Sequence, residues 1–267
     1  MSRISKCFEN LKAANKQALV PYITAGDPDP GDTVPLAHAL VEAGANIIEL
    51  GVPFSDPMAD GPIIQRASER ALAHHVSLRN VLDMVVDFRK QDKDTPIVLM
   101  GYLNPVEVMG YAEFARAAGE AGVDGVLTVD MPPEESEQLC EALVANNVDP
   151  IYLLAPTTDE ARIKKICDAA RGYVYYVSLK GVTGAASLDI GSVEEKISQI
   201  RSQTDLPIGV GFGIKDASTA AAISQIADAV VVGSALINII EQQMSHHSQM
   251  IDQVAALVSS MRKAMDS

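Results

Sequence analysis

One acidic residue interrupts an apolar segment near the end of the first fifth of the chain. Residues 46–52, "NIIELGV", have the composition of a buried parallel strand, yet they include Glu49. Side chains alternate along a strand, so Glu49 shares a face with Ile47, while Ile48 and Leu50 share the other. If Ile48 and Leu50 pack on surrounding helices, Glu49 points into the mouth of a barrel.

A buried carboxyl group is suited to proton transfer. Burial disfavours the ionised form and raises the pKa of a carboxyl group, which then both accepts and donates protons near neutrality. The alternative for Glu49 is a structural ion pair with a Lys or Arg. No basic residue lies in the neighbouring predicted strands, so the sequence favours catalysis.

Asp60 supplies a second acid on the loop that follows this strand. The segment "DGP" is also typical of a helix start with Pro62 at the first helical position, and turn chemistry explains Asp56 and Pro57 equally well. Together with Glu49, Asp60 would give paired carboxyl groups for proton transfer. A purely structural role for Asp60 remains an alternative.

Glycines in the last third of the chain predict a phosphate-binding site. Residues 207–214, "PIGVGFGI", and 229–240, "AVVVGSALINII", each end a predicted strand. Glycine lets backbone N–H groups approach a phosphate, and Ser234 begins a short helix whose N-terminus favours an anion. Glycines that serve tight turns alone are the alternative. Ile214 occupies the place of the third glycine of a dinucleotide fingerprint, so NAD binding is not expected.

Other residues near predicted strand ends have weaker signals. Lys180 could form a Schiff base only in a desolvated site, and its glycine-rich surroundings predict an exposed loop instead. Four aromatic residues fall at strand ends, where they either wall an apolar pocket or pack in the core. They are Tyr22, Tyr102, Tyr175 and Phe212.

The elements that must position these residues repeat along the whole chain. Short β-branched runs alternate eight times with stretches of helical period. Without a composition break, this pattern predicts an α/β fold formed by residues 1–267 as one domain, a single (β/α)₈ TIM barrel with extra helices. The predicted strands are 19–24, 46–52, 97–102, 125–129, 150–154, 173–178, 208–211 and 229–232. The predicted helices are 33–42, 63–74, 81–90, 111–121, 134–145, 160–170, 193–202, 217–226 and 249–262.

Active sites of such barrels lie at the carboxyl ends of the strands. The loops at residues 53–61 and 179–192 are long and are candidate lids over that face.

Composition excludes several classes of function. The net charge of −14 and the absence of a Lys/Arg cluster argue against a nucleic-acid partner. The first residues have no apolar segment of a signal peptide, and no stretch reaches the roughly 18 apolar residues of a membrane span, so we expect a cytoplasmic protein. Three distant cysteines predict no disulfide framework, and five histidines in helical stretches predict no metal site.

The segment "IELGVPFSDPMADGP", with Glu49 and Asp60 in it, resembles the signature of the tryptophan synthase alpha chain family. The segments "YITAGDP", "YLNP", "KGVTGA" and "GFGI" fall where that family has similar ones, and the resemblance covers nearly the whole chain. It implies a lyase of tryptophan biosynthesis that cleaves indole-3-glycerol phosphate to indole and glyceraldehyde 3-phosphate by a retro-aldol step, with no metal or cofactor in this chain.

The resemblance also implies roles for individual residues. Glu49 would be the general acid and base, and Asp60 would stabilise positive charge on the indole nitrogen. Thr183 would contact Asp60 from the closed lid. The expected phosphate-binding positions are Gly184, Gly213, Gly233 and Ser234, and the expected pocket residues include Tyr22, Tyr102, Tyr175 and Phe212. Two departures concern the pocket and the lid: Tyr22 stands where phenylalanine is common, and the lid lacks the arginine that some members carry.

A partner follows from the same resemblance. It is a tryptophan synthase beta chain, which holds pyridoxal phosphate and receives indole through a tunnel in an α₂β₂ complex. Pro53, Asp56, Asn104 and Pro132 would lie on the face that contacts it.

Two other functions compete with the lyase. A sugar-phosphate epimerase or isomerase barrel would share the phosphate site, but it commonly needs a metal cluster or opposed acids where this chain has Tyr22 and Leu153 or Leu154. A catalytically silent phosphate sensor that activates a partner would have no use for a desolvated Glu49.

Overall fold

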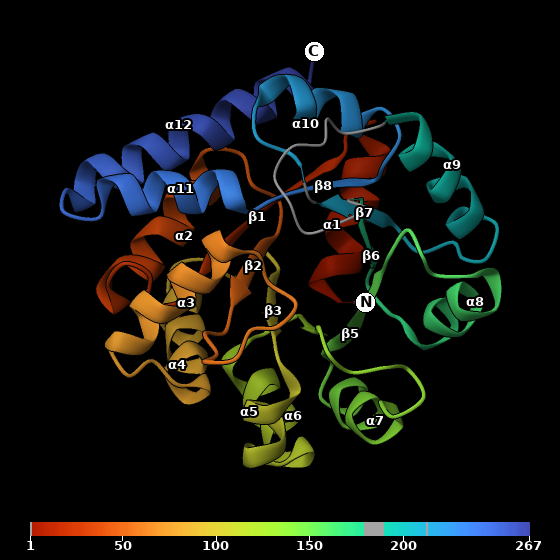
Figure 1. Cartoon of the computed structure of the whole chain (residues 1–267), viewed down its shortest axis with the longest axis horizontal. Helices are drawn as coiled ribbons and strands as arrows, with labels where there is room; N and C mark the ends of the chain where they lie inside the picture. The colour runs from red at the N-terminus through yellow and green to blue at the C-terminus, as the bar shows by residue number, and fades with distance from the viewer. Residues whose placement is uncertain (1, 179–189, 212) are drawn as a thin grey trace.

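Eight parallel strands close into a barrel that helices surround. The structure is a computed structural model that describes residues 2–178, 190–211 and 213–267. The strands follow each other around the barrel in chain order, β1 to β8, and β8 pairs with β1. Figure 1 shows the helices as an outer ring around the strands. The predicted (β/α)₈ barrel is therefore confirmed.

The strands are short, and almost all of their residues are buried. We call the carboxyl ends of the strands the upper rim and their amino ends the lower rim. Parallel pairing places Tyr22 of β1 opposite Glu49 of β2, and Glu49 opposite Val98 of β3. The strands are β1 (Ala18–Thr24), β2 (Ile48–Gly51), β3 (Ile97–Gly101), β4 (Gly125–Thr128), β5 (Asp149–Leu154), β6 (Val174–Val177), β7 (Ile208–Gly211) and β8 (Ala229–Val232).

In the part of the chain that the structure describes, some strands are followed by two helices. Several begin at a side-chain cap, for example Ser77 before α4 and Asp216 before α10, where the cap satisfies free backbone N–H groups. The helices are α1 (Arg3–Ala13), η1 (Pro30–Asp32), α2 (Thr33–Glu42), α3 (Pro62–Ala73), α4 (Leu78–Arg89), α5 (Leu103–Met109), α6 (Tyr111–Ala121), α7 (Glu137–Ala145), α8 (Glu160–Ala169), α9 (Ile190–Arg201), α10 (Ala217–Ser224), α11 (Ser234–Gln243) and α12 (His247–Met265).

Two apolar cores hold the barrel together. The larger core lies between the strands and the outer helices, and the smaller one fills the inside of the barrel. Helix α1 lies across the lower rim (Figure 1) and inserts Ile4 and Phe8 into the inner core. The Phe8 ring contacts the Tyr173 ring at 5.9 Å between centroids. Because these side chains fill the inside of the barrel from the lower rim, the cavity that reaches Glu49 lies at the upper rim.

The main differences from the predicted elements are two helices and one boundary. Helices α1 and α5 were not predicted. The spacing of Ile4, Phe8 and Leu11, on one face of a helix, was a signal for α1. The predicted helix start at residue 134 is wrong, because i to i+3 turns at Pro132 and Pro133 delay the helix until residue 137.

Candidate active site at the upper rim

Glu49 points into the barrel. Its neighbour Ile47 belongs to the inner core, whereas Ile48 and Leu50 pack in the outer core against the helices. The Glu49 side chain accordingly faces the same interior as Tyr173 and lines a cavity at the upper rim. The orientation predicted from strand alternation is the one that the structure has.

The Glu49 carboxyl group is buried without a cation. The residue is 1% exposed, and none of the ion pairs among residues 2–178, 190–211 and 213–267 includes it. Tyr173 donates a hydrogen bond to Glu49 Oε1 at 3.4 Å. Burial raises the pKa of Glu49 to about 8, while the Tyr173 hydroxyl lowers it. Glu49 is therefore protonated over much of the neutral range and ready to give up its proton.

Asp60 lies on the loop after β2 and is held by its surroundings. Tyr102 donates a hydrogen bond to Asp60 Oδ2 at 3.0 Å, and the same hydroxyl accepts one from the Ala59 N–H at 2.9 Å. Gln65, in the first turns of α3, donates to the Asp60 carbonyl at 2.9 Å. Burial raises the pKa of Asp60, and the Tyr102 hydrogen bond lowers it.

A cavity of about 70 Å³ brings the two acids together with the end of the barrel near β8. Of the predicted site residues, Tyr22, Glu49, Asp60, Tyr175, Gly213, Gly233 and Ser234 line it. Tyr102 does not line this cavity; it lies behind Asp60, where its ring stacks on Phe54 at 5.1 Å. Thr183, Gly184 and Phe212 fall outside the residues that the structure describes.

A wider hollow of about 650 Å³ adjoins this cavity and shares three of its lining residues. The shared residues are Asp60, Met100 and Tyr175. Val129, Leu153 and Val177 add apolar surface from β5 and β6 and from the loop after β4. The upper rim thus offers an apolar compartment next to Asp60, of a kind that fits a flat aromatic ring.

The cavity ends at the N-terminus of α11. Gly233 precedes the helix, and neither a side-chain cap nor an acidic residue occupies its first turn. Its first backbone N–H groups and the helix dipole favour an anion there. Gly213, which also lines the cavity, has φ of +77°, a left-handed backbone conformation that favours glycine.

The sequence analysis missed several residues of this site. Tyr173, the partner of Glu49, was read only as the start of a strand; its spacing of two from Tyr175 places both on the inner face and was the available signal. The other lining residues that were missed are Ile64, Met100, Ile214 and Val231. Apolar residues at such positions look like ordinary core residues in a sequence.

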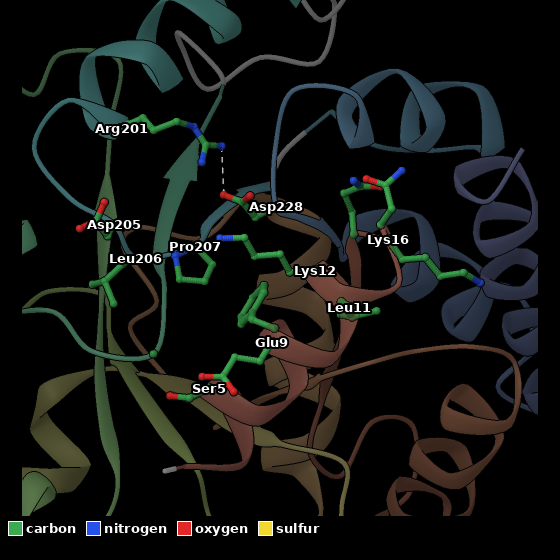
Figure 2. A pocket seen from close by; sticks show the side chains of 14 residues that line it. Ser5, Glu9, Leu11, Lys12, Lys16, Arg201, Asp205, Leu206, Pro207 and Asp228 are labelled. Carbon is green, nitrogen blue, oxygen red and sulfur yellow. Dashed lines mark hydrogen bonds and ion pairs between the residues drawn. The ribbon is translucent and has the colours of Figure 1, made fainter.

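The lower rim has a hollow of its own, about 450 Å³, between α1 and the loop before β7. Figure 2 shows Lys12 of α1 reaching toward Pro207, Glu9 of α1 beside Ser5, and the Arg201 guanidinium bound to Asp228 at 3.0 Å. None of the predicted site residues lines this hollow. It is an open surface on which the half-buried Asp228 is already paired with Arg201.

Two other kinds of site are not found in the part of the chain that the structure describes. Residues 2–178, 190–211 and 213–267 contain no cluster of three His, Cys, Asp or Glu side chains that could hold a metal ion. Within the same residues, no helix has the length and apolar character needed to cross a lipid bilayer.

The fold and this site define a class: a (β/α)₈-barrel enzyme whose buried acids and anion-favouring helix end meet at the upper rim. Comparison with known proteins narrows the class. The family model described as tryptophan synthase alpha chain matches residues 8–266. The chain belongs to the tryptophan synthase alpha chain family.

Individual relatives match this chain over nearly all of their length. The tryptophan synthase alpha chain of Thioalkalivibrio sulfidiphilus is 66% identical over 266 residues, and that of Methylococcus capsulatus is 60% identical, each covering 100% of both chains. The crystal structure of tryptophan synthase subunit alpha from Legionella pneumophila str. Paris matches with a TM-score of 0.93 at 48% identity, over 100% of this chain and 99% of that one. A structure of Mycobacterium tuberculosis tryptophan synthase matches with a TM-score of 0.90 at 37% identity, over 99% and 98%.

Proposed function

We propose that Glu49 and Asp60 perform the chemistry of the family reaction in this chain. Tryptophan synthase alpha chains are lyases that cleave indole-3-glycerol phosphate to indole and glyceraldehyde 3-phosphate, and this chain has that activity in tryptophan biosynthesis. The observation that carries the proposal is a buried Glu49, unpaired with any cation of residues 2–178, 190–211 and 213–267, that lines the same cavity as Asp60 and the N-terminus of α11.

Glu49 moves the proton in both halves of the reaction. Its protonated carboxyl group gives a proton to the indole ring carbon that bears the side chain, which turns the ring into an electron sink. The resulting Glu49 carboxylate then takes the proton of the adjacent side-chain hydroxyl. The hydroxyl becomes the aldehyde of glyceraldehyde 3-phosphate, the carbon–carbon bond breaks with its electrons returning to the ring, and indole leaves. A pKa of about 8 lets one carboxyl group perform both transfers near neutral pH.

Asp60 stabilises the charge that develops during this step. Protonation of the ring carbon places positive charge on the indole nitrogen, and a carboxylate close to that nitrogen lowers the energy of the charged intermediate. The Tyr102 hydroxyl favours the ionised form of Asp60 and orients it. Burial raises the pKa of both acids, and Glu49 is buried more completely than Asp60.

The rest of the cavity suits the rest of the substrate. The first N–H groups of α11, at Ser234, and the glycines Gly213 and Gly233 bind the phosphate, while Tyr22 and Tyr175 contact the ring. Thr183, Gly184 and Phe212 complete the lid, phosphate site and pocket in this proposal. The reaction needs only proton transfer and charge stabilisation, so the chain itself requires no cofactor.

A tryptophan synthase beta chain is the proposed partner, in an α₂β₂ complex that carries pyridoxal phosphate on the beta chain, in the cytoplasm. Exposed apolar side chains at the upper rim support this: Met58 is 86% exposed and Val108 is 83% exposed. Asp56 and Asn104 are exposed beside them, and Pro132 is half-buried. Pro53 is buried within this chain, so its part in the interface is to shape the loop rather than to contact the partner.

Measurement of indole release tests the assignment. The purified chain is incubated with indole-3-glycerol phosphate, and Glu49→Gln, which keeps the shape of the side chain but cannot transfer a proton, should lower the rate by at least about a hundredfold. Asp60→Asn should lower it as well, with binding of inorganic phosphate retained in both variants. A Glu49→Gln variant that works near the wild-type rate would refute the role of Glu49, and a wild-type chain that binds phosphate but releases no indole would indicate a sensor.

A further inference from the structure

One group of ion pairs joins α3 and α11, which both contribute residues to the cavity, and the loop after β1. The group consists of Asp27, on the loop after β1, Arg66 and Arg70 of α3, and Glu241 of α11. Helix α3 begins two residues after Asp60, and Ile64 in its first turn lines the cavity. Helix α11 begins at Ser234, on the phosphate side of the same cavity.

Arg70 is the member that contacts both of the other segments. Its Nε and Nη2 donate to the two Asp27 carboxylate oxygens at 2.6 and 3.0 Å, and its Nη1 donates to Glu241 Oε1 at 3.0 Å. The Asp27 side chain is 0% exposed and that of Arg70 is 19% exposed. A guanidinium group has the planar set of donors that this arrangement needs, which a lysine lacks.

The loop after β1 is pressed onto α3 at the same place. Gly26 has φ of +89°, and a Cβ there would lie 2.6 Å from Val76 Cγ2 and 3.3 Å from Ala71 Cβ. His74 Nε2 also lies 3.0 Å from the Pro28 carbonyl oxygen. Close packing and directed hydrogen bonds together allow little movement of α3 relative to this loop.

We propose that Arg70 is a positioning residue for the cleavage reaction: by bridging Asp27 and Glu241, it sets the spacing between α3, which anchors the Asp60 loop, and α11, whose N-terminus binds the phosphate. The proposal rests on the function proposed above. Phosphate binding and the placement of Asp60 depend on each other through this bridge. A displacement of about 1 Å at a reacting group costs up to about a hundredfold in rate, so a bridge behind the site affects catalysis without touching the substrate.

The decisive variant is Arg70→Lys. It keeps a positive charge beside the buried Asp27, so the chain should fold with nearly the wild-type midpoint of unfolding, but it cannot bond to both carboxylates in the same geometry. We expect kcat for indole release to fall at least about tenfold and inhibition by inorganic phosphate to weaken at least about threefold. A merely structural role predicts a lower unfolding midpoint with kcat and phosphate inhibition unchanged, and that result would overturn the proposal.

Glu241→Gln provides a second variant that leaves the buried pair of Arg70 and Asp27 intact. It weakens the bonds of both Arg70 and Arg66 to α11 and leaves the contact of α3 with the loop after β1 in place. We therefore expect weaker phosphate inhibition and a higher KM, with kcat within about twofold of wild type. Arg66→Gln is the matched control. Arg66 donates to both oxygens of the same Glu241, at 2.6 and 2.9 Å, but its side chain is 47% exposed and has no bond to Asp27. Water screens so exposed a pair, so the kinetics of this variant should stay within about twofold of wild type. Equal losses in Arg66→Gln and Arg70→Lys contradict the bridge.

Failure of the proposed function is separable from failure of this inference. If the wild-type chain releases no indole, the function is wrong, and calorimetric binding of inorganic phosphate to wild type and Arg70→Lys still tests whether Arg70 positions the phosphate site. Equal affinities of the two chains for phosphate would then overturn the role of Arg70, and a weaker affinity of Arg70→Lys would support it.

Discussion

The two rims of the barrel bury acids in opposite ways. At the lower rim, Asp124 is bound by Arg89 at 2.7 Å, by Arg3 at 2.8 Å and by the Ile97 N–H at 2.9 Å. At the upper rim, Glu49 is buried as deeply, but among the residues that the structure describes it has a single side-chain hydrogen bond, from Tyr173. The lower acid is a structural link between strand ends, and the upper acid is left free to change its protonation state.

This difference shows how one fold separates stability from chemistry. A carboxylate that is matched by guanidinium groups and backbone N–H groups holds the strands in place. A carboxyl group that is buried without a cation has a raised pKa and lowers the stability of the fold when it ionises. The barrel therefore tolerates the unfavourable acid at one rim because the other rim and the inner core hold the strands.

The largest expected effect on stability is at the lower rim. Arg89→Met keeps the length of the side chain but leaves Asp124 buried without its main partner, so we expect a loss of about 3–5 kcal/mol in the free energy of unfolding, measured by urea denaturation. Arg3→Met is the control, because the Arg3 side chain is 37% exposed, and it should cost about 1 kcal/mol or less. Indole release by the folded Arg89→Met chain should remain near wild type. If both variants lose equal stability, the contrast between the rims is wrong.

At the upper rim, by contrast, Glu49→Gln should raise the free energy of unfolding relative to wild type, and the gain should grow as pH rises. The folded Glu49 has a pKa of about 8, against its ordinary 4.5. Its contribution to stability is thus present below about pH 4.5 and is lost as pH rises through about 8, because the folded state holds the proton more tightly. Glutamine does not titrate, so the variant should gain about 1.4 kcal/mol per pH unit relative to wild type, roughly 4 kcal/mol between about pH 5 and about pH 8. A difference that does not change with pH contradicts the raised pKa.

Tyr173→Phe tests whether the Tyr173 hydroxyl lowers the pKa of Glu49. The Tyr173 hydroxyl lowers the pKa of Glu49, so its removal should raise this pKa further. Activity that requires protonated Glu49 falls as pH rises through its pKa, and the alkaline limb of kcat/KM should move up by about half a pH unit or more in the variant. Tyr176→Phe, from the outer core, serves as the control, because Tyr176 does not contact Glu49. An unchanged limb would show that Tyr173 does not tune Glu49.

The smallest effect is expected in the lower hollow of Figure 2. Arg201→Gln removes an ion pair to Asp228 whose side chains are 50% and 35% exposed, so the free energy of unfolding should fall by about 1 kcal/mol or less. Kinetics of indole release should be unchanged, because this hollow lies at the opposite rim from the acids. A clear change in KM or kcat would show that the lower hollow contributes to activity, which contradicts the division of roles between the two rims.

Much of the fold follows from the sequence. The periodicity of apolar residues predicted the eight strands, and the bounds of β7, β8, α2 and α6 agree with the prediction. Helices α1 and α5 were missed because one lies outside the repeating units and the other is a single short helix within a loop. Local patterns report which residues are buried, and they are weakest where an element is short or packs on an unexpected surface.

Less of the candidate site than of the fold could be predicted from the sequence. Glu49 stood out because a charge inside an apolar strand is unusual, and alternation along the strand gave its direction. The roles of the site residues stay predictions until the experiments above are done. The apolar lining, such as Met100 and Val231, could not be separated from core residues, because both have the same composition.

The sequence by itself determined the closed ring of strands, the inward direction of Glu49 and the family to which the chain belongs. Only the tertiary structure decided what surrounds that acid: the Tyr173 hydroxyl, from 124 positions further along the chain, and no cation among the described residues. It also decided that Arg70 joins Asp27 and Glu241. Periodicity is a property of neighbours in the chain, whereas a pKa or an ion pair depends on groups that only folding brings together.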